Sequence, residues 1–128
     1  MTSMSDKIRD ITAPYDNPFQ GTDLKLLFVC TMGILRSATA ANLYAKKGYN
    51  TRCVGSSEDA LIPLSMNLIA WADHIFFVNP ENYKQAEKKF HFSHELVNKS
   101  QVLNIPDQFE YNAPDLIRRL EEQVQLSI

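Results

Sequence analysis

Short runs of apolar residues alternate along the chain with longer segments in which apolar residues recur at helical spacing. The apolar runs, which predict buried strands, cover residues 24–30, 49–54, 75–78 and 101–105. The segments between and after them, which predict helices, cover residues 37–47, 64–72, 81–90 and 115–125. Strands that alternate with helices favour a mostly parallel sheet covered on both faces. The pattern therefore predicts the α/β class, with three α/β/α layers and a four-stranded parallel sheet.

The first 22 residues differ from the rest of the chain. They are polar and are interrupted by Pro14, Pro18 and Gly21, residue types that break regular structure. We interpret residues 1–22 as an N-terminal extension and residues 23–128 as one domain, a usual length for a single domain.

Charge and cysteine content narrow the classes of function. The formal net charge is -2, so the chain has no overall basic field to hold nucleic acid. Cys30 and Cys53 are the only cysteines, too few for a secreted disulfide scaffold. No apolar run approaches the roughly 20 residues that cross a bilayer, and the N-terminal stretch lacks the apolar segment of a signal peptide. We expect a cytoplasmic protein without nucleic-acid or membrane partners.

The segment between the first predicted strand and the first predicted helix carries the most specific chemistry. Cys30 ends the strand, five residues follow, and then come Arg36 and Ser37. Unpaired backbone N–H groups and the helix dipole make a helix start an anion site, and Gly33 permits the positive φ of a tight loop. Arg36 adds a permanently charged, two-pronged donor. The pattern predicts a phosphate-binding loop.

A cysteine at the base of such a loop can act as a nucleophile. An isolated cysteine on an apolar strand usually only packs in the core, but the electropositive loop favours its thiolate, and a thiolate facing a phosphoryl group is placed to attack it. Ser37 is expected either to donate to this thiolate or to cap the helix. The loop residues expected to bind the substrate are Thr31, Met32, Gly33, Ile34 and Leu35.

Residues 28–37 resemble the phosphate-binding loop of the low-molecular-weight protein tyrosine phosphatases, and are closest to the short bacterial branch of predicted phosphatases in that family. Three further segments are similar to the same family, at residues 54–57, 71–78 and 105–117. The resemblance extends over roughly residues 24–125 and leaves the N-terminal extension unexplained.

The resemblance implies a cysteine-dependent phosphomonoester hydrolase that needs no metal or other cofactor. Cys30 would form a cysteinyl-phosphate, while Arg36 and the loop amides would hold the equatorial oxygens. Asp107 matches the acid that protonates the leaving oxygen and then activates water. The implied substrate is a phosphorylated protein, such as one carrying phosphotyrosine, or a small aryl phosphate.

Several residues near the predicted acid also have structural interpretations. Asp107 has the alternative role of a turn residue. Asp115 is a rival acid, but it follows Pro114 and fits the first turn of a helix better. Phe109 and Tyr111 are expected either to wall the substrate site or to pack in the core.

The loop departs from the family pattern in ways that leave other functions open. Met32-Gly33 stands where the family usually has Gly-Asn, so the side-chain hydrogen bonds of a bracing asparagine are missing. Leu35 replaces a common second cysteine, which excludes a disulfide within the loop. The main alternative is therefore a weakly active or inactive phosphate-binding module that recognises a phosphorylated partner.

Two further alternatives are less favoured. Arsenate reduction requires a relay of thiols, for which only Cys53 is available. A phosphocysteine carrier requires a phosphodonor protein, and the carboxylate of Asp107 argues against it.

His91 and His94 are three residues apart without the surrounding ligands of a metal site.

Overall fold

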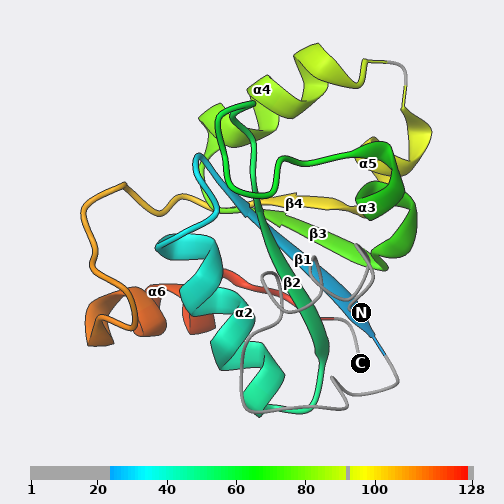
Figure 1. Ribbon diagram of the computed structural model, residues 1–128. Coiled ribbons are helices and arrows are strands. Elements are labelled where there is room, and N and C mark those ends of the chain that lie inside the picture. The colour runs from blue at the N-terminus through cyan, green and yellow to red at the C-terminus, as the bar shows by residue number, and fades with distance from the viewer. Residues whose placement is uncertain (1–23, 92, 127–128) are drawn as a thin grey trace, which may run out of the picture.

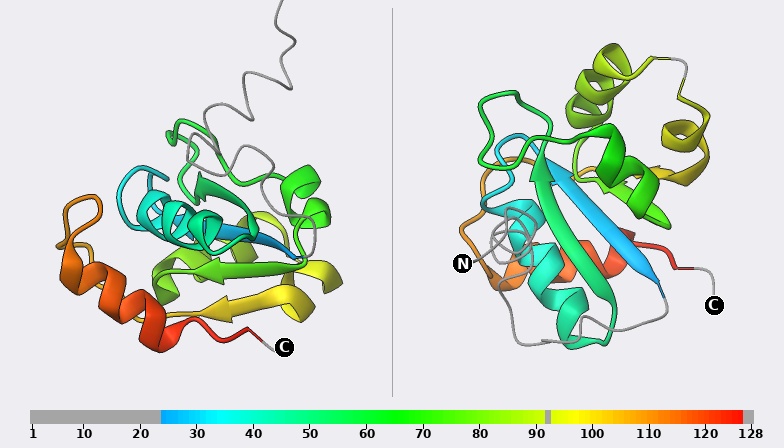
Figure 2. Two further views of the ribbon diagram at one scale, coloured as in Figure 1. Left: turned by 90° about the horizontal axis from the view of Figure 1, so that it is seen from below. Right: turned by 45° about the vertical axis from the view of Figure 1, so that its right-hand side comes forward.

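The computed structural model describes residues 24–91 and 93–126, which form three layers (Figure 1). The central layer is a parallel sheet of β1 (Lys25–Cys30), β2 (Asn50–Gly55), β3 (His74–Phe77) and β4 (Ser100–Val102). The helices are α2 (Arg36–Lys46), α3 (Met66–Trp71), α4 (Pro80–Lys89), α5 (His94–Lys99) and α6 (Pro114–Gln123). Helices α2 and α6 cover one face of the sheet and α3, α4 and α5 the other (Figure 2). The predicted α/β/α architecture with four parallel strands is confirmed.

Strand β1 lies inside the sheet and supplies side chains to both cores. Leu26 and Phe28 pack on the side of α2 and α6, whereas Leu27 and Val29 pack on the side of α3, α4 and α5. All four are fully buried, because successive side chains of a strand point to opposite faces and both faces are covered. This explains why the segment is a nearly continuous apolar run rather than an alternating one.

The strand order places the end of β1 where ligands bind in folds of this kind. The sheet has the order β2-β1-β3-β4, so β1 has β2 on one side and β3 on the other. The chain leaves β1 toward α2 on one face of the sheet and leaves β3 toward α4 on the other face. Where the chain turns to opposite faces in this way, a crevice forms at the carboxyl ends of the two strands. Cys30 is the last residue of β1 and pairs with Gly55, the last residue of β2. The loop that follows Cys30 therefore begins at this crevice.

Two local features differ from the sequence expectation. Helix α5 was not predicted; it begins after Ser93, whose side chain accepts a hydrogen bond from Leu96 N at 3.2 Å, and it buries Leu96. The fourth strand, expected over 101–105, ends at Val102. Leu103 N and Ile105 N still donate to carbonyl groups at the end of β3, but Pro106 has no N–H with which to continue the ladder.

Two expectations from the sequence concern the chain as a whole: the N-terminal extension and the lack of a membrane span. The extension predicted at residues 1–22 lies outside the described residues. Within the described part of the chain, no helix combines the length and the apolar character needed to cross a bilayer.

The stacked rings beneath α2 give a test of the core. Phe28 lies 5.2 Å from Phe76 and 5.6 Å from Tyr44, measured between ring centroids. We expect Phe28→Leu to lower the free energy of unfolding by roughly 1–3 kcal/mol, measured by urea denaturation. The control is Val97→Ala on α5, where Val97 is 61% exposed, and it should change stability by less than about 0.5 kcal/mol. Equal losses in the two variants would contradict the assigned core.

Candidate active site

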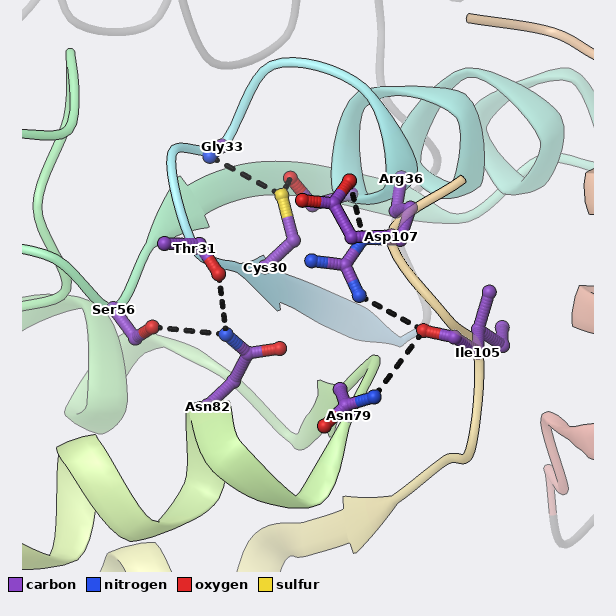
Figure 3. Close-up of polar contacts among 10 residues, drawn as sticks. Cys30, Thr31, Gly33, Arg36, Ser56, Asn79, Asn82, Ile105 and Asp107 are labelled. Carbon is purple, nitrogen blue, oxygen red and sulfur yellow. Dashed lines mark hydrogen bonds and ion pairs between the residues drawn. The ribbon is translucent and has the colours of Figure 1, made fainter. Parts of the chain in front are cut away.

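The thiol of Cys30 lies at the base of the loop formed by residues 31–35. Gly33 N donates a hydrogen bond to Cys30 Sγ at 3.2 Å, and Ser37 Oγ lies 3.0 Å from the same sulfur (Figure 3). Ser37 is fully buried, and α2 has no side-chain cap at its N-terminus. Of the two roles expected for Ser37, the structure places its hydroxyl against the sulfur. Donors aimed at sulfur stabilise the thiolate over the thiol.

The tight path of the loop depends on Gly33. Its φ is +75°, and a Cβ added there would lie 2.8 Å from the carbonyl carbon of Val54 and 2.9 Å from Gly55 N. Both contacts are with backbone, which cannot move aside as a side chain can. Two hydrogen bonds tie the loop to the segment after β2, from Ser56 N to Cys30 O at 2.7 Å and from Ser57 N to Thr31 O at 3.0 Å. The loop is thus pressed against the end of β2.

Arg36 joins the loop to the segment that follows β4. Its side chain is 4% exposed, and Nη1 donates to Ile105 O at 2.8 Å. Asp107 Oδ1 lies 3.7 Å from Arg36 Nε, while the Asp107 side chain is 68% exposed. Figure 3 shows the side chains of Cys30, Arg36 and Asp107 turned toward one another. A thiol, a buried cation and a carboxyl group from separate parts of the chain therefore lie close together.

A bracing residue that the sequence did not reveal comes from α4. Asn82 is 1% exposed, and its Nδ2 donates to Thr31 Oγ1 and to Ser56 Oγ, both at 3.1 Å. Asn79 Nδ2 lies 3.4 Å from Ile105 O, the carbonyl that also accepts from Arg36. Asn82 supplies the loop with side-chain hydrogen bonds that Gly33 cannot make. Its position in the third predicted helical segment, residues 81–90, gave no signal of this role.

The three central groups line one cavity of about 260 Å³. Its lining consists of Cys30, Thr31, Met32, Ile34, Leu35, Arg36 and Asp107. The side chains of Met32, Ile34 and Leu35 are 38%, 53% and 40% exposed. We call this space the catalytic cavity; its base is polar and charged, and its mouth is apolar.

The remaining candidates lie outside this cavity. Phe109 packs against the core beneath α2 and α6, with the guanidinium of Arg119 5.4 Å from its ring centroid. Tyr111 is 40% exposed and does not line the cavity either. Substrate contact by these two rings stays a prediction.

The rival acid and the histidines are placed as follows. Asp115 lies in the first turn of α6, with its Oδ1 3.3 Å from Arg118 Nη2, the arrangement expected of a residue at a helix start. Among the described residues, no three or more His, Cys, Asp or Glu side chains cluster in a way that could hold a metal ion.

Cys53 differs from Cys30 in its surroundings. It pairs with Phe28 across β1 and β2 and is 5% exposed. Burial raises the pKa of the Cys53 thiol to about 12, and the negative charge of nearby Cys30 adds to the effect. Cys53 therefore stays protonated at neutral pH and is a poor nucleophile.

Several solved structures of phosphatases share this fold. The YwlE arginine phosphatase from Geobacillus stearothermophilus superposes with a TM-score of 0.58, at 22% identity, over 78% of this chain and 92% of that chain. The tyrosine phosphatase Wzb from Escherichia coli K30, in complex with phosphate, gives a TM-score of 0.58 at 14% identity, over 80% and 94% of the two chains. A low molecular weight protein tyrosine phosphatase from Bacillus subtilis gives 0.54 at 15% identity, over 78% and 96%.

These comparisons define the fold. No family model matches the sequence, and no curated protein sequence matches it. The chain has the fold of the low-molecular-weight protein tyrosine phosphatases, as the resemblance predicted. At these identities the likeness concerns the fold, and any statement about chemistry depends on the site itself.

The loop glycine offers a matched pair of variants. Gly33 and Gly48 both have positive φ, but a Cβ at Gly48 would meet nothing within 4 Å. We expect Gly48→Ala to cost about 1 kcal/mol of stability through backbone strain alone. Gly33→Ala should cost about 2 kcal/mol or more and weaken vanadate binding by at least about tenfold, because the loop must shift. Calorimetry measures the vanadate affinity, and urea denaturation measures the loss of stability. Unchanged vanadate affinity in Gly33→Ala would contradict the described loop.

The two cysteines should differ in reactivity. We expect iodoacetamide at neutral pH to alkylate the folded protein once, at Cys30, and the unfolded protein twice. The reason is that Cys53 is buried with its pKa raised to about 12. Peptide mass spectrometry identifies the modified residue, and phosphate or vanadate in the cavity should slow the reaction. Faster labelling of Cys53 than of Cys30 would show that the thiols are assigned wrongly.

Proposed function

We propose that the protein is a cysteine-dependent phosphomonoesterase of the low-molecular-weight protein tyrosine phosphatase type. The observation that carries the proposal is the catalytic cavity, in which the Cys30 thiol, the buried guanidinium of Arg36 and the carboxyl group of Asp107 line a single space. A phosphoryl group bound there has a nucleophile on one side and a proton donor near its outer side. Hydrolysis requires these two functions together with charge stabilisation.

In the first step, the Cys30 thiolate attacks phosphorus and forms an S–P bond as the P–O bond to the leaving group breaks. Asp107, in its protonated form, gives its proton to the leaving oxygen. Arg36 and the loop amides bind the equatorial oxygens, where negative charge is concentrated in the transition state. Gly33 N and Ser37 Oγ, at 3.2 Å and 3.0 Å from the sulfur, stabilise the attacking thiolate.

In the second step, Asp107 is a carboxylate and takes a proton from water. The water oxygen attacks phosphorus, the S–P bond breaks, and inorganic phosphate leaves while the Cys30 thiolate is restored. Together the two steps consume the phosphate ester and one water molecule, and they need no other reactant. The same carboxyl group acts as acid and then as base, so its position beside Arg36 serves both half-reactions.

The surroundings of the cavity support an aromatic phosphate ester as the substrate. Met32, Ile34 and Leu35 form an apolar mouth around the charged base, and an aryl ring gains free energy when it leaves water for such a surface. Phosphotyrosine in a protein and a small aryl phosphate both meet this requirement. A thiolate nucleophile in a chain with two cysteines suits the reducing cytoplasm.

A phosphate-recognition module is the second candidate. The loop has Met32 where the resembling family usually has glycine, and the Met32 side chain lines the cavity. Such a loop would hold the phosphoryl group of a partner without releasing it as inorganic phosphate. The two candidates share the binding site and differ only in turnover.

The test is hydrolysis of aryl phosphates without added metal at mildly acidic pH. Cys30→Ser should lose turnover of p-nitrophenyl phosphate almost completely, since no attacking thiolate remains. Asp107→Asn should lose roughly 10²–10⁴-fold with phenyl phosphate and less with p-nitrophenyl phosphate, whose leaving group needs less protonation. Asp115→Asn is the matched control, because Asp115 is an exposed helix residue paired with Arg118, and it should keep wild-type rates.

Each outcome separates the candidates. Turnover that persists in Cys30→Ser would refute the proposed mechanism. Vanadate binding by a wild-type protein that hydrolyses neither ester would favour the phosphate-recognition module. A loss in Asp115→Asn that exceeds the loss in Asp107→Asn would transfer the acid role to Asp115.

A further inference from the structure

A second cavity of about 270 Å³ adjoins the catalytic cavity. Thr31, Arg36 and Asp107 line both spaces, so the two meet beside the expected position of the phosphoryl group. The residues that line only the second space are Asn79, Glu81, Asn82 and Pro106. We call it the polar cavity. Whereas the catalytic cavity opens between apolar side chains, this one is bounded by carboxyl, amide and hydroxyl groups from the start of α4 and the segment after β4.

Hydrogen-bond acceptors predominate on its wall. Glu81 and Asp107 contribute carboxylates, which accept but do not donate when ionised. Both Nδ2 hydrogens of Asn82 are committed to the hydroxyls of Thr31 and Ser56, and one Nδ2 hydrogen of Asn79 is committed to Ile105 O. On the part of the wall formed by Glu81 and Asn82, the remaining capacity is therefore to accept hydrogen bonds from a ligand.

One buried acceptor in the wall lacks a partner. Asn82 is 1% exposed, and its Oδ1 makes no hydrogen bond. Figure 3 shows this oxygen turned away from Thr31 and Ser56, toward the side on which Arg36 and Asn79 lie. A buried polar atom without a partner costs free energy. Because Asn82 Oδ1 has almost no exposed surface, a small rotation of the amide into the cavity would let an N–H group of a ligand remove that cost.

The charges around the cavity favour a cation. Among the described residues that line it, Arg36 is the only positively charged one. Its guanidinium is engaged by Ile105 O and lies beside Asp107. The phosphoryl group in the neighbouring space adds further negative charge. Glu81 takes no part in the two chemical steps, so its charge remains available to a ligand throughout the reaction.

We propose that the polar cavity is a substrate subsite that binds the ammonium or guanidinium group of a basic residue adjacent in sequence to the phosphorylated residue. The inference rests on the proposed function and narrows it to phosphopeptides with a neighbouring lysine or arginine. Glu81 supplies the carboxylate for this contact, and Asn82 Oδ1 supplies a second acceptor.

The test uses binding, so that it does not depend on turnover. Blocked peptides carry a non-hydrolysable difluorophosphonate analogue of phosphotyrosine, flanked on either side by lysine or by the uncharged norleucine. One lysine peptide has its lysine before the analogue and the other has it after. We expect the tighter-binding of these two to bind wild type about threefold more tightly than the norleucine peptide of the same design at low salt, the size of effect typical of a partly exposed ion pair. The preference should diminish as salt is raised, because counterions screen exposed charges.

Two variants of α4 locate the effect. Glu81→Gln should reduce the preference for lysine to about one. Glu87→Gln removes another exposed charge from the same helix, away from the cavity lining, and should keep the preference. A preference of one in wild type, or a preference that survives in Glu81→Gln, would overturn the subsite.

Turnover of p-nitrophenyl phosphate by the same preparations reports on the proposed function separately. If that ester is hydrolysed while the lysine and norleucine peptides bind equally, the subsite is wrong and the phosphatase proposal stands. If neither peptide binds, the subsite is also wrong. If the ester is not hydrolysed but the lysine preference is present and depends on Glu81, the subsite belongs to a recognition module and only the hydrolytic proposal fails.

Discussion

The buried guanidinium of Arg36 is the interaction on which the arrangement of the site depends. A charge that is 4% exposed must be compensated by hydrogen bonds and opposite charge, since burial of an isolated charge costs several kcal/mol. In this chain the compensation comes from Ile105 O and Asp107, which lie on a segment almost seventy residues further along. The side chain of Arg36 thus fixes the position of the loop after β1 relative to the segment after β4. The Cys30 thiol and the Asp107 carboxyl group share a cavity because both segments are tied to Arg36.

The parallel sheet makes this meeting possible. All four strands run in the same direction, so the segments that follow them emerge at one edge of the sheet. β1 provides the thiol, β2 ends in the backbone against which the loop is pressed, β3 leads into the α4 residues that brace it, and β4 is followed by the acid. Each strand contributes only a few residues, and these residues come together at one edge of the sheet. Helices on both faces bury most of β1, β2 and β3.

The sequence predicted the elements of the site that are encoded locally. An apolar run that ends at Cys30, with Arg36 at the start of a helix, indicates a phosphate loop because strand, loop and helix start all follow from neighbouring residues. Of the partners that lie far away in the sequence, Asp107 was proposed only through the family resemblance, and Asn82 was not predictable. Asn82 belongs to a polar helix, and only the three-dimensional fold brings it to Thr31. Helix α5 was missed because its six residues contain only two apolar side chains, and a single buried leucine carries the packing. Phe109 and Tyr111 follow the acid closely in sequence, yet the chain turns between them and the cavity.

The pairing of β1 with β2 has a consequence for the oxidation of Cys30, the proposed nucleophile. Cys30 stands opposite Gly55 and Cys53 stands opposite Phe28, so the two sulfur-bearing residues lie on the same face of adjacent strands, offset by two positions. Strand spacing and rise place their Cα atoms about 8 Å apart, beyond the span of about 7 Å that a disulfide can bridge without backbone movement. An oxidised Cys30 therefore has no resolving cysteine within its own chain, and its return to the thiolate depends on a thiol supplied by another molecule.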